Sequence, residues 1–134
     1  MTTDLQMLTW TAALTAVLWL PYIGTRLAVS GIIPSLTYRD GLAPLPAWAQ
    51  RAKGAHGNAV ENLVPFAALV IVAHLTGTAS EATAAEATAF FWARAAHAVL
   101  YVANVPFGRT IAFAIGWVAM AGIFFQIVAG AAAS

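Results

Sequence analysis

Long apolar stretches constrain the fold of this chain more than any other feature. A helix needs about 20 apolar residues to cross the hydrocarbon core of a bilayer. The 134 residues are 61% hydrophobic and only 8% charged, far below the charged share of a typical soluble domain. We therefore expect an all-α membrane protein, a four-transmembrane-helix bundle in which residues 1–134 form a single membrane domain. The predicted spans are about 5–30, 47–75, 83–103 and 109–128.

The ends of the spans are marked by turn-forming and capping residues. A cleaved signal peptide is the alternative reading of the first stretch, but Asp4 stands where such a peptide has basic residues. The apolar run also continues past any plausible cleavage point, which favours a retained span. Thr83 and Glu86 have the form of a capping box and predict the start of the third helix.

Basic residues are distributed unevenly over the connections. Arg39, Arg51 and Lys53 lie around the first connection and Arg109 lies at the third, whereas the second has only acidic residues nearby. Basic residues favour the cytoplasmic side of a membrane. We expect a multi-pass protein with its first and third connections in the cytoplasm and both termini outside it.

Composition excludes several kinds of chemistry. The chain has no Cys, so it contributes neither a disulfide nor a nucleophilic thiolate. A net charge of +1 with scattered basic residues gives no reason to expect nucleic acid as a partner. His56 and His74 are 18 residues apart on one predicted helix, too far to share a metal, and no zinc-ligand spacing is present. We predict no metal site.

Polar residues recur at helical spacing inside the second and third spans. Arg51, Asn58 and Glu61 fall on one face of the second span, and Arg94 and His97 begin a stripe on the third. A lone carboxylate at membrane depth is costly unless it is paired. Because the third span runs antiparallel to the second, Arg94 is within reach of Glu61, and we predict an ion pair between them.

More polar groups lie on these facing stripes than one ion pair needs. Asn58, Asn62, His97 and Tyr101 remain once Glu61 has a partner. This surplus predicts a polar cavity that opens toward the cytoplasm. The alternative is a purely structural ion pair that fixes the register of the two helices.

Three further features have simpler readings from the residues alone. Arg26 is near the end of the first span, where a basic side chain extends to the interface. Arg109 at the start of the fourth span is a topology determinant. Small residues at Gly116, Ala119 and Gly122 form a strip suited to close helix packing.

Two motifs together resemble one known family. Residues 55–66 read Ala-His-x-Asn-x-x-Glu-x-x-x-Pro-Phe, and the third span has Arg94-x-x-His97-x-x-x-Tyr101, followed by Pro106 and Arg109. With four spans and a long first connection, the chain is similar over nearly its whole length to the membrane-associated proteins in eicosanoid and glutathione metabolism. It resembles a bacterial-type member of that family.

The resemblance implies a homotrimer that binds glutathione between neighbouring protomers near the cytoplasmic face. It also implies that Arg109 has the catalytic role of stabilising the glutathione thiolate. Such a site needs several cationic donors, because glutathione has two carboxylates and a thiol that reacts only as the thiolate. The candidate glutathione-binding residues are Asn58, Glu61, Arg94, Tyr101, Arg51, Arg26 and His97.

The chain departs from the family pattern at positions that matter for this ligand. Gly54 and Gly57 stand where catalytic members tend to have Arg on either side of the Ala-His pair. Phe113 stands where a Tyr is common, and Arg109 aligns only with a gap. Two of the expected cations are therefore missing.

Three functions remain open at this point. The first is a membrane glutathione-dependent transferase or peroxidase acting on hydrophobic electrophiles. The second is a non-catalytic trimer that binds a lipid or a partner protein in the bilayer. The third is a proton-coupled exporter, which needs a carboxylate free to titrate and is disfavoured because Glu61 has an expected Arg partner.

Overall fold

A computed structural model describes the whole chain except residues 38 and 134. The described residues form helices and no strand, which confirms the all-α prediction. The helices are α1 (Thr3–Val17), α2 (Leu20–Ser30), α3 (Ile32–Leu36), α4 (Ala47–Leu75), α5 (Glu81–Val102) and α6 (Pro106–Ala133).

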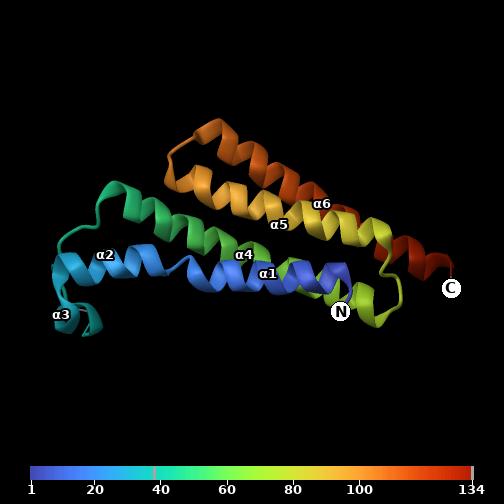
Figure 1. Cartoon of the computed structure of the whole chain (residues 1–134), viewed down its shortest axis with the longest axis horizontal. Coiled ribbons are helices and arrows are strands. Elements are labelled where there is room, and N and C mark those ends of the chain that lie inside the picture. Colours follow the sequence, from blue (N-terminus) through green and yellow to red (C-terminus); the bar gives the residue numbers. More distant parts are fainter. Residues whose placement is uncertain (38, 134) are drawn as a thin grey trace.

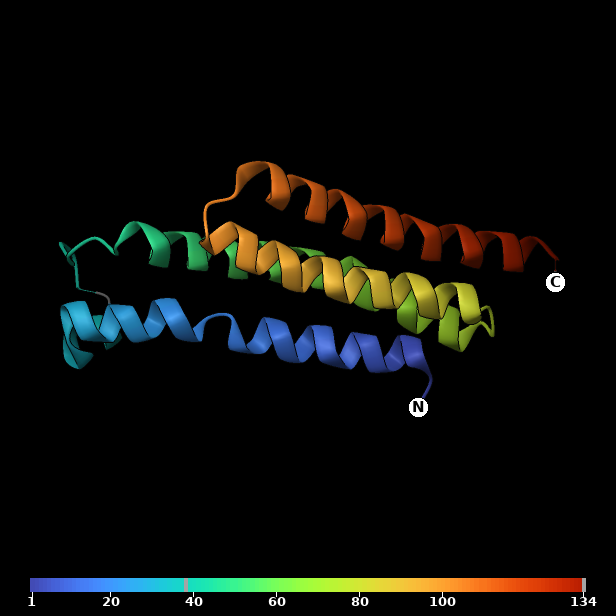
Figure 2. The ribbon, with the colours of Figure 1, turned by 45° about the horizontal axis from the view of Figure 1, so that its top comes forward.

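The long helices lie alongside one another, and successive ones run in opposite directions. α1 and α2 follow each other along one side of the molecule, next to α4, while α5 and α6 form a hairpin against them (Figures 1 and 2). Both termini lie toward the same end, and the connection that contains α3 lies at the other. α5 packs against α6, α4 and α1, and most extensively against α6.

Three segments are long and apolar enough to cross a membrane. They are Thr3–Ser30, Ala47–Leu75 and Pro106–Ala132. α5 is not among them, and its 22 residues include Glu81, Glu86 and Arg94. These three helices indicate that the chain is a membrane protein. The fourth crossing, which we expect α5 to make, stays a prediction.

The first predicted span is two helices rather than one. α1 ends at Val17, and α2 begins at Leu20 with Pro21 in its first turn. Proline has no N–H, and its ring clashes with the carbonyl four residues earlier, which here belongs to Val17. The break therefore falls where the proline requires it, and the predicted span over 5–30 corresponds to these two consecutive helices, which together form the candidate span Thr3–Ser30.

The start of α5 also differs from expectation. The N-cap is Ser80, whose side chain accepts from the Thr83 backbone N–H at 3.3 Å, while the Thr83 hydroxyl accepts from the Ser80 N–H at 2.8 Å. This is a reciprocal capping box, with Thr83 in the place where Glu or Gln is usual. The expected box from Thr83 to Glu86 is wrong by one turn, because Thr83 is the third residue of the helix and not its cap.

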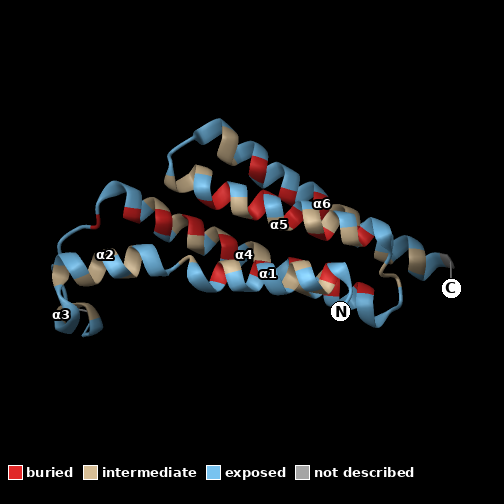
Figure 3. Ribbon diagram, viewed as in Figure 1, coloured by how far each residue is buried: buried red, intermediate tan, exposed pale blue. Residues whose placement is uncertain are grey.

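The apolar core lies where α4, α5 and α6 meet. Buried positions on these helices face one another across the bundle (Figure 3). The rings of Phe66 and Phe90 are stacked with centroids 3.8 Å apart, and both side chains are fully buried. Ala119 and Ile123 of α6 complete this cluster, and Leu5 of α1 packs against it. The small-residue strip of α6 faces α5, since Gly116 lies against Arg94 and Ala93.

Removing one ring of the stacked pair tests this core. Phe66→Ala leaves a cavity between α4 and α5 that the surrounding helices fill only in part. We expect it to lower the thermal midpoint of the detergent-purified protein clearly. Phe107→Ala is the control, since Phe107 is 84% exposed. Equal midpoints for the two variants would contradict this assignment of the core.

Candidate functional site

A polar cavity lies between α4, α5 and α6, close to the turn that joins α5 to α6. Its volume is about 270 Å³. The side chains that line it come from all three helices, which the antiparallel packing brings to the same level. The lining residues are Asn58, His97, Tyr101, Arg109, Thr110 and Phe113.

The structure brings together four of the residues predicted for the site and adds two. Asn58, His97, Tyr101 and Arg109 share this cavity. Thr110 and Phe113 were outside the predicted set, although Phe113 is four residues from Arg109 and three from Thr110, spacings that make side chains neighbours on a helix surface. That spacing is the signal that could have identified them.

Arg94 lies behind this cavity and holds its wall in place. It is only 3% exposed. Its Nη2 donates to the side-chain oxygen of Asn58 and to Nδ1 of His97, the latter at 2.9 Å. Its Cζ lies 5.5 Å from the centroid of the Phe113 ring, a distance suited to a cation–π interaction. One guanidinium therefore fixes a lining residue from each of the three helices.

The predicted ion pair between Glu61 and Arg94 is wrong for this chain. Nη2 of Arg94 bonds to Asn58 and His97, while its Nε and Nη1 are buried without a hydrogen-bond partner. Glu61 is exposed. Three residues along a helix turn the side chain by about 300°, so Glu61 points roughly 60° away from Asn58 around α4. Asn58 is the residue that faces Arg94.

The contact with Arg94 fixes which nitrogen of His97 carries the proton. A guanidinium only donates hydrogen bonds, so Nδ1 of His97 must accept. The neutral ring then carries its hydrogen on Nε2. His97 is 3% exposed and lines the cavity. It thus has one N–H left to offer to a bound molecule.

Arg109 lies over the face of Tyr101. Its Cζ is 4.5 Å from the centroid of the tyrosine ring. The residue belongs to the first turn of α6, where the helix dipole already favours an anion. The guanidinium and the helix terminus therefore attract negative charge to the same end of the cavity.

Gly54 makes room for Tyr101. A Cβ at position 54 would lie 2.8 Å from the Tyr101 hydroxyl oxygen and 3.1 Å from two ring carbons. Gly57 differs, because a Cβ there would have no neighbour within 4 Å. The absence of a side chain at 54 is thus tied to the position of Tyr101, whereas position 57 is open. Nothing in the residue pattern indicated this coupling.

Besides Glu61 and Arg94, two more predicted site residues are not among those that line the cavity. Arg51 donates from Nε to the carbonyl oxygen of Val102 at 2.8 Å, which satisfies a carbonyl in the last turn of α5. Arg26 lies between α2, the first connection and α4, in a separate pair of cavities. Within one protomer neither residue joins the Asn58 cluster.

The lining of the cavity suits a ligand with negative charge. It offers the Arg109 guanidinium, the Nε2–H of His97 and the hydroxyls of Tyr101 and Thr110. No Asp or Glu is among the described residues that line it. A carboxylate or thiolate would find several donors and no opposing charge. The described residues contain no group of His, Asp or Glu arranged to hold a metal ion.

Comparison with known families gives one match. The model of the MAPEG family matches residues 7–129. The chain belongs to the MAPEG family. This family includes glutathione transferases and peroxidases as well as non-catalytic members, and its members generally use glutathione. No curated protein and no solved structure matches the chain.

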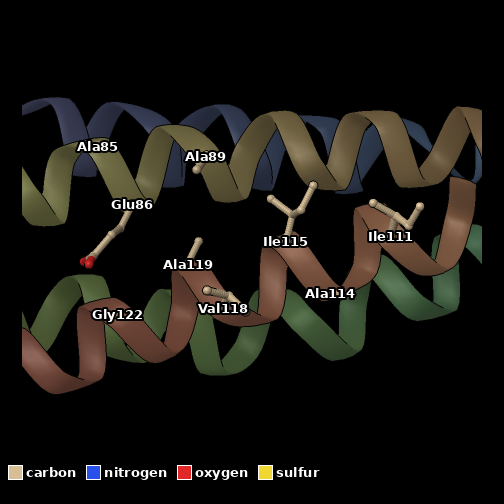
Figure 4. A pocket seen from close by; sticks show the side chains of 9 residues that line it. All are labelled: Ala85, Glu86, Ala89, Ile111, Ala114, Ile115, Val118, Ala119 and Gly122. Carbon is tan, nitrogen blue, oxygen red and sulfur yellow. The ribbon is translucent and has the colours of Figure 1, made fainter.

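A second hollow of this MAPEG chain lies on the opposite side of the α5–α6 hairpin. It measures about 650 Å³ and is almost entirely apolar. Figure 4 shows the carboxylate of Glu86 directed from α5 toward α6 at one end of the groove. Glu86 is the only charged residue among those that line it, and one of its oxygens is buried without a partner. The groove is lined by Ala85, Glu86, Ala89, Ile111, Ala114, Ile115, Val118, Ala119 and Gly122.

A pair of glycine substitutions tests the contact between α4 and Tyr101. Both Gly54→Ala and Gly57→Ala gain helix propensity of up to about 1 kcal/mol. Gly54→Ala also forces Tyr101 to move, and overpacking of this kind costs about 1–3 kcal/mol. We expect Gly54→Ala to lower the thermal midpoint and to shift the NMR signals of labelled Tyr101. Gly57→Ala should leave both unchanged or raise the midpoint slightly, and the same response from both variants would refute the contact.

Proposed function

We propose that this protein is a membrane glutathione-dependent transferase or peroxidase that acts on hydrophobic electrophiles. The observation that carries the proposal is the cavity in which Arg109, His97, Tyr101 and Thr110 present donors without an opposing carboxylate. Membership of the MAPEG family supports glutathione as the donor of the thiol. Electrophiles soluble in the bilayer reach such a site from the lipid phase.

In this proposal Arg109 is the catalytic residue. A thiol reacts as its thiolate, and a nearby guanidinium lowers the cost of forming that anion. The first turn of α6 adds the positive end of a helix dipole at the same place. Glutathione brings the sulfur that attacks the electrophile. The protein holds the thiolate and the substrate in reacting distance.

The remaining residues orient glutathione. Tyr101, Thr110 and the Nε2–H of His97 bind its polar groups, and Arg94 acts as a positioning residue through Asn58 and His97. Arg94 also keeps two buried nitrogens without a partner, so the wall retains positive charge that a nearby anion stabilises.

A homotrimer completes the site in this proposal. The cavity of one protomer, about 270 Å³, is at the lower limit for a small-molecule site. Glu61, which the family motif assigns to glutathione, and Arg51, a candidate from the polar face of α4, lie outside it. Neighbouring copies would add binding groups across the interface, with the site facing the cytoplasm and the termini outside.

The alternative is a non-catalytic member of the family that binds a lipid or a partner in the membrane. Two features favour it: the apolar groove beside Glu86, and glycine at positions 54 and 57 where catalytic relatives tend to have Arg. A binding protein would keep the Arg94 cluster for its architecture alone.

Replacing Arg109 distinguishes the two functions. In an enzyme, Arg109→Ala removes the charge that stabilises the thiolate and should lower kcat about 100- to 1,000-fold. Arg109→Lys should recover part of this loss because it keeps a positive charge. The measurement is turnover of glutathione with a chlorinated aromatic acceptor, together with the ultraviolet absorbance of the thiolate.

The controls separate catalysis from folding and from assembly. Arg39→Ala, at an exposed position in the first connection, should retain full activity. Size-exclusion mass measurement should give the same oligomer for all variants. A wild-type protein with no turnover and no thermal shift in millimolar glutathione would exclude the enzyme and leave the alternative.

A further inference from the structure

The apolar groove on the α5–α6 hairpin, the Glu86 groove, has the features of a second ligand site. Its volume of about 650 Å³ is within the range of small-molecule sites. Glu86 is the one charged residue among the described residues that line it, and the others are small or aliphatic. The groove shares no lining residue with the polar cavity around Asn58, the Asn58 cavity. An apolar cavity with one fixed polar group is typical of a binding site.

The Glu86 carboxylate lies against α6 at one end of the groove (Figure 4). A Cβ at position 122 would overlap Oε1 of Glu86, so Gly122 leaves room for this carboxylate. The other oxygen, Oε2, is buried and has no hydrogen-bond partner. The carboxylate is therefore positioned by packing, but its charge is not compensated.

The level of Glu86 along the bundle is within the hydrocarbon. Gly122, which Glu86 contacts, lies about 15 Å along the helix from the end of the candidate span Pro106–Ala132. A hydrocarbon core of about 30 Å centred on this span includes Gly122 and the carboxylate beside it. A carboxylate without a partner is costly at this depth. A cationic donor in the groove would remove that cost.

The apolar part of the groove runs from Glu86 toward the turn between α5 and α6. On α6 it extends from Gly122 back to Ile111, about 16 Å along the helix. Alanine at positions 89 and 114 leaves this length open. A ligand with its polar group at Glu86 would thus lay its chain across the middle of the membrane. The headgroup of a phospholipid stays outside the hydrocarbon, so the groove suits a smaller compound dissolved in the bilayer.

We propose that the Glu86 groove binds a lipophilic amine, whose ammonium group pairs with Glu86 and whose alkyl chain lies between α5 and α6. An ammonium group brings both a positive charge and N–H donors for Oε2. No Lys, Arg or His among the described residues that line the groove competes for the carboxylate. This ligand is not the electrophile of the proposed reaction, because Arg109 lines the Asn58 cavity on the other side of the hairpin.

The test compares two ligands that differ only in their head group. Dodecylamine carries an ammonium group at neutral pH, and dodecanol has a hydroxyl on the same chain. Binding of each tritiated ligand to the full-length protein, immobilised in a neutral maltoside detergent, is measured by scintillation proximity. We expect the wild-type protein to bind dodecylamine more tightly than dodecanol. Glu86→Gln should weaken dodecylamine binding about tenfold, as expected for the loss of one hydrogen bond to a charged group, and leave dodecanol binding unchanged.

Matched control variants separate the groove from general effects. Glu81→Gln removes an exposed carboxylate of α5 that does not line the groove, and it should leave the binding of both ligands unchanged. Ala89→Leu narrows the groove and should weaken the binding of both ligands. Ala129→Leu, at an exposed position of α6 outside the groove, should weaken neither. Because positions 81, 89 and 129 are exposed and glutamine matches glutamate in size, we expect all variants to keep the wild-type thermal midpoint.

Three results would overturn the proposal. Equal binding of dodecylamine and dodecanol by the wild-type protein would show that the carboxylate does not select the ligand. An equal loss of dodecylamine binding in Glu81→Gln would reduce the effect to general surface charge. If the protein binds neither ligand and Glu86→Gln changes the mass of its oligomer, a second copy of the chain covers the groove.

Glutathione turnover, measured on the same samples, keeps this proposal apart from the proposed enzyme. Dodecylamine binding that depends on Glu86, in a protein without turnover, supports the amine site and refutes the enzyme. Turnover in a protein that does not distinguish the two ligands supports the enzyme and refutes the amine site.

Discussion

The buried guanidinium of Arg94 is the constraint on which the bundle depends most. An arginine stays charged under all ordinary conditions, and it is costly to bury in a low-dielectric interior. Here the cost is offset by Asn58, His97 and the face of Phe113, each on a different helix. Because these contacts need specific positions on α4, α5 and α6, they fix the register of the three helices. The apolar contacts of the neighbouring core are less directional, so they would tolerate small shifts of one helix along another.

The same constraint shapes the cavity in front of Arg94. Asn58 and His97 each direct one polar atom back toward the guanidinium and have others left for the cavity. Arg109 lies on the cavity side, with its guanidinium over the ring of Tyr101. The neutral donors of the cavity wall therefore lie between two positive charges, with Arg94 behind them and Arg109 in front. An anion in the cavity interacts favourably with both charges, whereas a cation would be repelled by both.

Helical periodicity was sufficient to place most of this site but not to choose its pairs. The spacing of Arg94, His97 and Tyr101 correctly put them on one face of α5, and Asn58 on the facing side of α4. The choice of Glu61 as the partner rested on charge, which favours the acid over the amide. Geometry reverses that choice, because a difference of about 60° around a helix decides which of two neighbouring side chains reaches across.

Other features were present in the sequence but needed a more local rule. The break between α1 and α2 is explained by the clash of the Pro21 ring with the carbonyl four residues earlier. The N-terminus of α5 is explained by Ser80 as the N-cap, with Thr83 in the partner position of the capping box. The contact between Gly54 and Tyr101 could not be found in this way. It depends on the separation of α4 and α5, which the packing of the whole bundle sets.

Gly54 also lies at the boundary between the Asn58 cavity and the cavity of about 610 Å³ that Arg26 and Lys53 line. It lines the larger cavity beside Arg26 and Lys53, and the space its side chain would take is occupied by the Tyr101 ring of the other cavity. A long side chain at this position would displace Tyr101 and enter the neighbouring cavity. An arginine there would place a further positive charge at the boundary between the two spaces. With glycine, Tyr101 forms the partition, and each cavity keeps its own cations.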